Sequence, residues 1–307
     1  MKFLDNVDEM EFNKFVKENS SNFMQTSYYG RINKTKGFNY HLTGLKENDK
    51  LIASALVLEK KLIGKYTYLY IPRGFILDLN NKDLITTFIN HLKSFGKKKH
   101  AIYICIDPEE VISIDGKKKD IILLNILKNL GFKHLGFNYF FENNQPRFTY
   151  QLDLNDDLFN NFHPTTKKIY NRGNIFDIEI YKGTENDIKK FHDLMLETAN
   201  RNNATFFSLN YYKDFYKIFK ENNMSDIYLA KADINKVKNY YVNEINTMKT
   251  NLDKMKNKNK IADLNEKLKK YEKEYNEVLE IKDDKVILSA IITVKFNDLV
   301  WTVHGGN

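Results

Sequence analysis

The chain has 307 residues, enough for two domains of ordinary size, and 42% of them are hydrophobic, enough for packed cores. No run approaches the roughly eighteen consecutive apolar residues of a membrane-spanning helix, and the first residues turn polar at once, unlike a secretory signal. The net charge of +8 favours a polyanionic partner such as RNA, a phosphate-bearing ligand or an anionic membrane face. The single cysteine, Cys105, excludes an internal disulfide, so we expect a cytoplasmic protein.

The first half of the chain alternates predicted helices and strands. The predicted helices are 8–17, a short one from about 27, 81–95 and 119–130, and the predicted strands are 51–58, 65–71, 101–106, 137–142 and 149–154. Two strands end in conspicuous residues, Pro72-Arg73-Gly74 and Asp107-Pro108. Open α/β sheets bind ligands at the carboxyl ends of their strands, which makes Arg73 and Asp107 candidate site residues. Capping of the following turn is an equally good interpretation of Asp107.

A second unit begins near residue 155, and a long helical insertion interrupts it. The predicted helices are 156–162, 167–173, 185–200 and 209–221, and the predicted strands are 176–181, 228–231 and 286–294. The insertion, 234–282, carries apolar residues at heptad spacing, namely Ile261, Leu264, Leu268, Tyr271, Tyr275 and Val278, after a similar but interrupted stripe. Such seams are buried only if the two helices fold back on each other, so the pattern predicts an antiparallel coiled-coil arm. A structural spacer or a dimer contact is the alternative interpretation.

The motifs of several enzyme classes are missing from the sequence. The seven histidines form no HExxH or similar metal-binding pair, and there is no GxSxG elbow, P-loop or GxGxxG. Hydrolase, NTPase and Rossmann interpretations therefore have no sequence support, and no metal site is predicted. We expect Cys105 to lie in the core.

A series of short motifs follows the order found in the FemABX peptidyltransferases. They are Phe23-Met24-Gln25-Thr26, Tyr70-Ile71-Pro72-Arg73-Gly74, Ile106-Asp107-Pro108, Gln145-Pro146 with Leu152-Asp153-Leu154, Asn161-Phe162-His163, Thr166-Lys167, Leu194-Met195, Thr198-Ala199-x-Arg201 and Tyr211-Tyr212. The chain resembles this family over essentially its whole length, and the inserted arm resembles that of the FemA branch.

The resemblance implies an α/β fold with mixed sheets and two GNAT-like acyltransferase domains. The first would span 1–148, and the second would comprise 149–233 and 283–307, on either side of the arm at 234–282. Family members continue past the position of Gly305-Gly306 through a helix and closing strands. We therefore expect the chain to be truncated and its second domain to be incomplete.

The resemblance also implies an acyltransferase that moves an amino acid from aminoacyl-tRNA to the stem-peptide amine of a peptidoglycan precursor of the lipid II type, building interpeptide bridges. An aminoacyl ester is already activated, so this chemistry needs alignment and charge stabilisation and no cofactor besides the aminoacyl-tRNA co-substrate. The implied partners are aminoacyl-tRNA and lipid II, with a peripheral contact at the cytoplasmic membrane. Whether the truncated chain is active is left open.

Site residues carried over from the family come from both halves of the chain. Asp107 is the candidate catalytic residue, accepting a proton from the attacking amine or orienting that amine. The candidate substrate-binding residues are Arg73, Lys34, Lys36, Lys167, Arg201, Tyr211 and Tyr212. Family members often carry a phosphate-binding lysine where this chain has Asn33, so the neighbouring lysines are the substitutes for that ligand.

Two other functions are alternatives. A conventional GNAT N-acetyltransferase would share the fold, but the Arg/Gln-x-x-Gly-x-Gly/Ala pyrophosphate loop is missing from the sequence. A nonenzymatic RNA-binding or scaffold protein would use the basic arm, and its binding would depend mainly on the tip lysines Lys256, Lys258 and Lys260.

Overall fold

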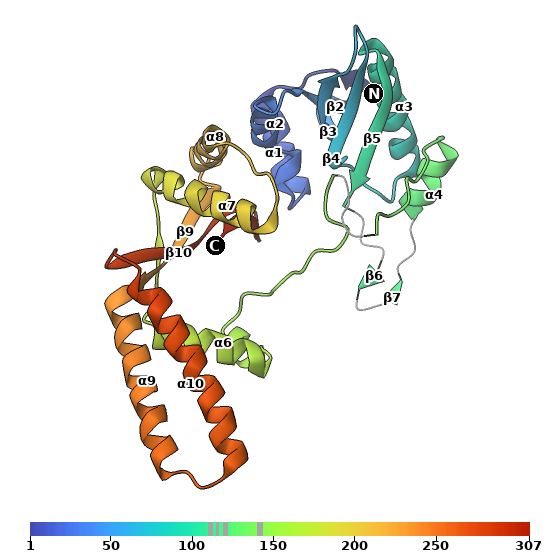
Figure 1. Ribbon diagram of the computed structural model, residues 1–307. Helices are drawn as coiled ribbons and strands as arrows, with labels where there is room; N and C mark the ends of the chain where they lie inside the picture. The colour runs from blue at the N-terminus through green and yellow to red at the C-terminus, as the bar shows by residue number, and fades with distance from the viewer. Residues whose placement is uncertain (110–112, 115–116, 119–121, 140–143) are drawn as a thin grey trace. The chain divides into compact units, whose positions relative to one another are not determined.

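The computed structural model describes residues 1–109, 113–114, 117–118, 122–139 and 144–307. It is mixed α/β with two main sheets, which confirms the predicted fold class (Figure 1). By its contacts the chain divides into unit 1, which comprises 1–150, 213–225 and 294–301, and unit 2, which comprises 151–212, 226–293 and 302–307. The domain boundaries inferred from the sequence stay predictions.

Unit 1 contains a five-stranded sheet in the order β1-β2-β3-β4-β5. Its elements are β1 (Lys2–Leu4), α1 (Glu9–Asn19), the 3-10 helix η1 (Phe23–Gln25), α2 (Ser27–Lys34), β2 (Asn39–Glu47), β3 (Lys50–Lys61), β4 (Thr67–Arg73), α3 (Lys82–Lys98), β5 (Ala101–Pro108), β6 (Ser113–Ile114), β7 (Lys117–Lys118) and α4 (Ile122–Asn129). Neighbouring strands of the five-stranded sheet are antiparallel except for β4 and β5, which are parallel. The carboxyl ends of β4 and β5 therefore meet at one edge.

Helices cover both faces of this sheet (Figure 1). On one face α3 and α4 bury Phe88, Phe95 and Leu123 in a core that includes Leu69 and Ile71 of β4. On the other face α2 packs against β2 and β3. A Cβ at Gly30 would lie 2.7 Å from the Tyr40 ring, so the missing side chain brings α2 close enough to place residues at the sheet edge.

Most of the predicted elements of unit 1 are confirmed. The helices predicted at 8–17, 81–95 and 119–130 are α1, α3 and α4, and the strands predicted at 51–58, 65–71 and 101–106 are β3, β4 and β5. The strand predicted at 149–154 is wrong, because those residues have no regular secondary structure. The strand predicted at 137–142 lies partly outside the described residues.

Unit 2 contributes to a second sheet in the order β11-β10-β9-β8. The elements of the second half are α5 (Leu158–Asn161), α6 (Pro164–Ile175), β8 (Glu179–Lys182), the 3-10 helix η2 (Glu185–Asp187), α7 (Ile188–Asn202), α8 (Leu209–Lys220), β9 (Ser225–Asp233), α9 (Ile234–Lys254), α10 (Lys258–Leu279), β10 (Lys285–Phe296) and β11 (Leu299–Gly306). A Cβ at Gly306 would lie 3.0 Å from the backbone nitrogen of Met195, so glycine lets β11 approach α7 closely.

The hairpin predicted at 234–282 is present as the antiparallel helices α9 and α10 (Figure 1). Tyr241 of α9 contacts α10 in two ways. The Tyr241 ring lies 5.6 Å from the Tyr271 ring between centroids, and the Tyr241 hydroxyl donates to Glu274 at 3.1 Å. Ile245 and Met248 of α9 are buried. These contacts join the two helices, and supercoiling of the pair stays a prediction.

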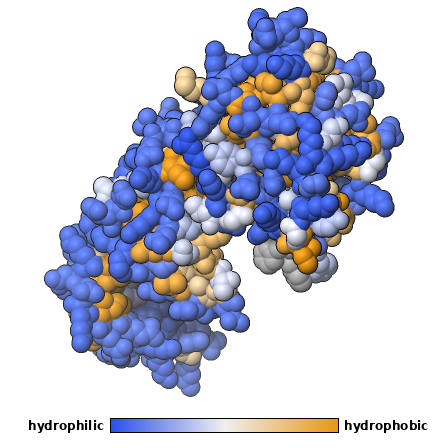
Figure 2. Space-filling model, turned by 90° about the horizontal axis from the view of Figure 1, so that it is seen from above, coloured by the Kyte–Doolittle hydropathy of each residue, from blue (hydrophilic) through white to orange (hydrophobic). Residues whose placement is uncertain are grey.

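The surface is mostly hydrophilic on the face shown in Figure 2, and its hydrophobic residues form separate patches. Among the described residues, no helix combines the length and the apolar character needed to cross a bilayer.

Candidate active site

The two strand ends singled out in the sequence lie side by side in unit 1. The parallel register places Pro72 opposite Asp107 and Arg73 opposite Pro108. The backbone N–H of Arg73 donates to Oδ1 of Asp107 at 2.6 Å, and the hydroxyl of Tyr70 donates to Oδ2 at 2.7 Å. Each carboxylate oxygen of Asp107 therefore accepts a hydrogen bond from β4, which fixes the carboxylate at the carboxyl edge of the sheet.

Burial dominates the electrostatics of this pair. It raises the pKa of Asp107 above its ordinary value, and the hydrogen bonds from Arg73 and Tyr70 oppose that rise. Burial and the negative charge of Asp107 together raise the pKa of Tyr70 far above its ordinary value. Tyr70 therefore stays protonated as a donor, while Asp107 moves toward the pKa range in which a carboxylate works as a general base.

Arg73 has an unusual backbone conformation. Its φ of +50° is in the left-handed region, which costs a non-glycine residue about 1–3 kcal/mol. In this conformation its N–H reaches Asp107, and its half-buried guanidinium donates to the carbonyl oxygen of Pro146 at 2.7 Å. Surrounding contacts must stabilise this turn. The positive charge of the guanidinium also lowers the pKa of Asp107, against the effect of burial.

The end of β4 is held by a buried glutamine. The side chain of Gln25 is completely buried, donates through Nε2 to the Pro72 carbonyl and accepts the N–H of Leu56 at 2.9 Å. A Cβ at Gly74 would lie 2.4 Å from Cδ of Gln25, so this close approach requires glycine. Gln25 and Gly74, two motif residues without an assigned role, thus position the residues around Asp107.

Sequence reasoning missed two further members of the site, Tyr29 and Gln145. Burial raises the pKa of Tyr29, and the side chains of Asn33 and Gln145 oppose that rise; Gln145 likewise opposes the rise in the pKa of Tyr70. Gln145 therefore lies beside both tyrosines, and Tyr70 in turn donates to Asp107. Asn33 is buried on α2, so the position at which the family often has lysine faces this network. The available signal was helical spacing, because Tyr29 precedes Asn33 by one turn.

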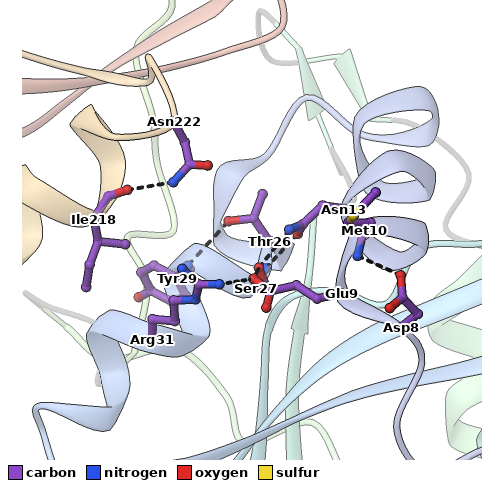
Figure 3. A network of polar contacts seen from close by, with 10 residues as sticks. All are labelled: Asp8, Glu9, Met10, Asn13, Thr26, Ser27, Tyr29, Arg31, Ile218 and Asn222. Carbon is purple, nitrogen blue, oxygen red and sulfur yellow. Dashed lines mark hydrogen bonds and ion pairs between the residues drawn. The ribbon is translucent and has the colours of Figure 1, made fainter.

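Polar contacts between α1 and α2 set the orientation of the helix that carries Tyr29 (Figure 3). Glu9 accepts from the Ser27 hydroxyl at 2.7 Å and from Arg31 at 2.5 Å, and Asn13 donates to the Ser27 hydroxyl at 2.7 Å. The same carboxylate raises the pKa of Arg31 through its hydrogen bond. Arg31 of α2 is therefore paired with Glu9 of α1 within unit 1, and this contact helps to fix the helix that carries Tyr29.

The two lysines proposed as phosphate ligands differ in burial. Lys34 is exposed at the end of α2, whereas Lys36 is half-buried between α2 and β2. Desolvation lowers the pKa of Lys36 to about 8. An amine with this pKa is still mostly charged at pH 7, and its surroundings disfavour that charge. Contact between this amine and a bound anion would therefore be strongly favourable.

Replacing Lys36 with Met should stabilise unit 1 at pH 7, by on the order of 1–3 kcal/mol. The pKa of Lys36 in the folded state, about 8, is below its ordinary value of 10.5. Between these two pH values the unfolded chain binds more protons than the folded chain, so the stability of the wild type rises with pH across that window. The gain should therefore shrink between pH 7 and pH 10 in denaturant unfolding measurements. A gain that is equal at both pH values would contradict a desolvated amine.

The candidate tyrosines lie in unit 2 and are largely buried. The Tyr211 ring stacks on that of Phe207 at 4.0 Å, and its hydroxyl lies 3.5 Å from Nε2 of His304. Tyr212 is completely buried and contacts the rings of Phe191 and His304 at 5.0 and 5.2 Å. Tyr212 thus belongs to the core of unit 2, and the roles of both tyrosines in positioning substrate stay predictions.

The two candidate phosphate-binding cations of unit 2 lie on separate helices. Lys167 is exposed on α6 and donates to the carbonyl of Asn160 at 2.8 Å. Arg201, near the end of α7, donates to the side chain of Asn307 at 2.7 Å. Their roles as phosphate ligands also stay predictions.

Cys105 is half-buried on β5, two residues before Asp107. Burial raises the pKa of its thiol, and Asn144 donates to Sγ at 3.4 Å. In the parts of the chain that the structure describes, no three His, Cys, Asp or Glu side chains are grouped as they would be around a metal ion.

Known proteins resemble this chain over most of its length. The model of the FemAB family matches residues 7–307. The lipid II:glycine glycyltransferase of Staphylococcus aureus strain MRSA252 is 28% identical over 234 residues, which cover 74% of this chain and 54% of the relative. The protein of the same name from Staphylococcus epidermidis strain RP62A is 24% identical and covers 98% of this chain and 76% of the relative. Aminoacyltransferase FemA of Staphylococcus aureus strain RF122 is 29% identical and covers 70% and 56%.

The crystal structure of FemX has the same fold, with a TM-score of 0.74 at 23% identity over 100% of this chain and 80% of that one. The chain spans 54% to 76% of the length of the curated relatives described above. Because the family model matches nearly the whole chain, the protein belongs to the FemAB family.

Proposed function

We propose that the protein is an aminoacyltransferase that moves an amino acid from aminoacyl-tRNA to the stem-peptide amine of a lipid II-type peptidoglycan precursor. The observation that carries the proposal is the Asp107 carboxylate, fixed by Tyr70 and Arg73 at the carboxyl edge of a sheet in a FemAB chain. Relatives named lipid II:glycine glycyltransferase and aminoacyltransferase FemA support it.

In the proposed reaction the amine nitrogen attacks the carbonyl carbon of the aminoacyl ester. A C–N bond forms, the C–O bond to the tRNA ribose breaks, and the proton lost by the amine ends on the ribose oxygen. Asp107 accepts or orients the amine proton, and its raised pKa suits that task. The ester is already activated, so we propose that the reaction needs no metal and no cofactor besides aminoacyl-tRNA.

Charge supports the choice of partners. Both proposed substrates carry phosphates, and the chain has a net charge of +8. The acceptor is a lipid-linked molecule, so we also propose that the protein works in the cytoplasm with a peripheral contact at the inner face of the membrane.

Replacing Arg73 with Ala should lower kcat/KM for the lipid-linked precursor by roughly ten- to a hundredfold, the value of a charge-assisted hydrogen bond. The backbone N–H to Asp107 remains, so the fold should persist. Arg147→Ala, which removes an exposed arginine of the same unit, is the matched control and should leave kcat/KM unchanged. Equal losses in both variants would show a general charge effect and contradict a role for Arg73 in the site.

The function itself is tested by incubating the chain with lipid II and tRNA charged with a mixture of labelled amino acids. Label should enter the lipid fraction, and it should do so only when both substrates are present. If tRNA binds and no label reaches the lipid, the nonenzymatic RNA-binding alternative replaces the transferase.

A further inference from the structure

The turn between β3 and β4 exposes two large aliphatic side chains. Leu62 is 47% and Ile63 is 80% exposed. The turn is regular: the N–H of Leu62 donates to the carbonyl of Tyr66 at 2.9 Å, that of Tyr66 donates to the carbonyl of Ile63 at 3.0 Å, and Gly64 has a φ of +58°. A hydrogen-bonded turn therefore holds apolar side chains out in water, where they gain nothing in the isolated chain.

Lysines surround this tip on one edge of unit 1. Lys60, Lys61 and Lys65 flank it directly, and Lys97 and Lys98 end α3, which leads into β5. The register brings these segments together, because the last pair of β3 and β4 joins residues 61 and 67, and residue 67 is also paired with 101 of β5. We call these five lysines the basic edge.

Among the residues that the structure describes, few acidic groups offset the charge of the basic edge. Asp5 pairs with Lys98 at 3.3 Å, while Glu59 pairs with Lys99 at 3.6 Å and with His41 at 2.6 Å. The three lysines of the turn thus retain a net positive charge around the aliphatic tip. The edge lies at the amino-terminal ends of β4 and β5, opposite the end that carries Asp107.

Tyrosines complete the composition of this edge. Tyr66 is 48% and Tyr103 is 51% exposed, and the Tyr103 ring stacks on that of Tyr68 at 5.4 Å. Tyrosine rings suit the boundary between lipid and water because one end is apolar and the other forms hydrogen bonds. Aliphatic tip, lysines and tyrosines therefore share one edge.

We propose that the basic edge and the Leu62–Ile63 tip dock unit 1 on an anionic lipid bilayer. Anionic headgroups attract the lysines, and the two aliphatic side chains enter the boundary of the acyl chains. A single-stranded RNA would be bound by lysines and stacked aromatic rings and would leave the aliphatic tip in water, so the observations favour a bilayer. The proposed function includes a membrane contact, and the inference names the surface that makes it. In that respect alone the inference rests on the proposed function.

Binding to vesicles tests this inference without lipid II or tRNA, so it can fail independently of the transferase. The wild-type chain should bind vesicles of phosphatidylcholine and phosphatidylglycerol and bind vesicles of phosphatidylcholine alone far more weakly. Leu62→Ser with Ile63→Ser should weaken binding at least about tenfold. Lys60→Gln, Lys61→Gln and Lys65→Gln together should weaken it by roughly fivefold for each lysine.

Two matched controls separate this edge from other charged and apolar surfaces. Lys256→Gln, Lys258→Gln and Lys260→Gln remove the same charge from the tip of the arm, and Ile180→Ser removes an isoleucine that is 72% exposed on β8. Both should bind vesicles as the wild type does. Far-ultraviolet circular dichroism confirms that each variant is folded, and the fluorescence of Trp301 reports on unit 1, which carries the Leu62–Ile63 tip.

Three results would overturn the inference. The first is a Leu62 and Ile63 double variant that binds vesicles as the wild type does. The second is an equal loss in the arm-tip variant, which would show that net charge alone decides binding. The third is no vesicle binding by the wild type together with a loss of oligonucleotide binding in the Lys60, Lys61 and Lys65 variant, which would make the edge an RNA surface.

Discussion

Replacing Asp107 with Asn is expected to reduce aminoacyl transfer to lipid II at least about 100-fold, the lower range for the loss of a general acid–base group. The amide keeps the shape of the carboxylate and can still accept from the N–H of Arg73 through its oxygen. It cannot take a proton from an amine. The reduction should therefore fall on kcat, with unit 1 still folded.

The stability of the Asp107→Asn variant follows from the sign of the pKa shift. The folded-state pKa of Asp107 lies above the ordinary 3.8, so the neutral form stabilises the fold at low pH, and this contribution is lost as the pH rises through the folded-state pKa. At pH 7 the variant should be no less stable than the wild type. Asp49→Asn, in the exposed β2–β3 turn, is the matched control and should keep full activity. Full activity of Asp107→Asn would remove this carboxylate from the mechanism.

Replacing Gln25 with Ala should destabilise unit 1 by about 3 kcal/mol. The truncation leaves the Leu56 N–H and the Pro72 carbonyl without their buried partner, and each unsatisfied group costs roughly 1–3 kcal/mol. The unfolding free energy can be followed by fluorescence of the single tryptophan, Trp301, whose ring lies 6.0 Å from that of Phe23 within unit 1. Gln151→Ala, at an exposed glutamine, should change stability by less than about 0.5 kcal/mol.

A double-mutant cycle with Gly74→Ala tests the cause of that loss. The added methyl group would lie 2.4 Å from Cδ of Gln25, so Gly74→Ala alone should cost about 1–3 kcal/mol through overpacking. Removing the glutamine side chain makes room for the methyl group. The double variant should therefore lose less stability than the sum of the losses in the two single variants. Strict additivity would mean that Gln25 and Gly74 act independently.

Segments with strong periodicity could be predicted from the sequence. The run from Leu51 to Leu58 and the helical stripe of residues 81–95 became β3 and α3 because burial on one or both faces dictates such patterns. Strand β2 was missed, since Gly44 interrupts it and glycine weakens a strand signal. A Cβ at residue 44 would lie 2.5 Å from Cδ1 of Leu51 and 2.7 Å from Cγ2 of Val7, so any larger residue would displace these side chains. Long-range packing decides such a strand.

The site could be predicted only in part, for a related reason. Asp107 and Arg73 are visible because each stands at the end of a strand, beside a proline or glycine. Tyr29 and Gln145 carry no local signal, and they reach Asp107 through contacts between segments that are far apart in the sequence. The parallel pairing of β4 with β5 brings Arg73 and Asp107 to one edge.

Mass spectrometry of lipid II after incubation with this chain and charged tRNA is the most direct test of the proposed transfer. The predicted product is lipid II heavier by one aminoacyl residue, and fragmentation should place that residue in an amide bond on a stem-peptide amine. Unchanged lipid II, with the tRNA still charged or merely hydrolysed, would contradict an aminoacyltransferase that uses this acceptor.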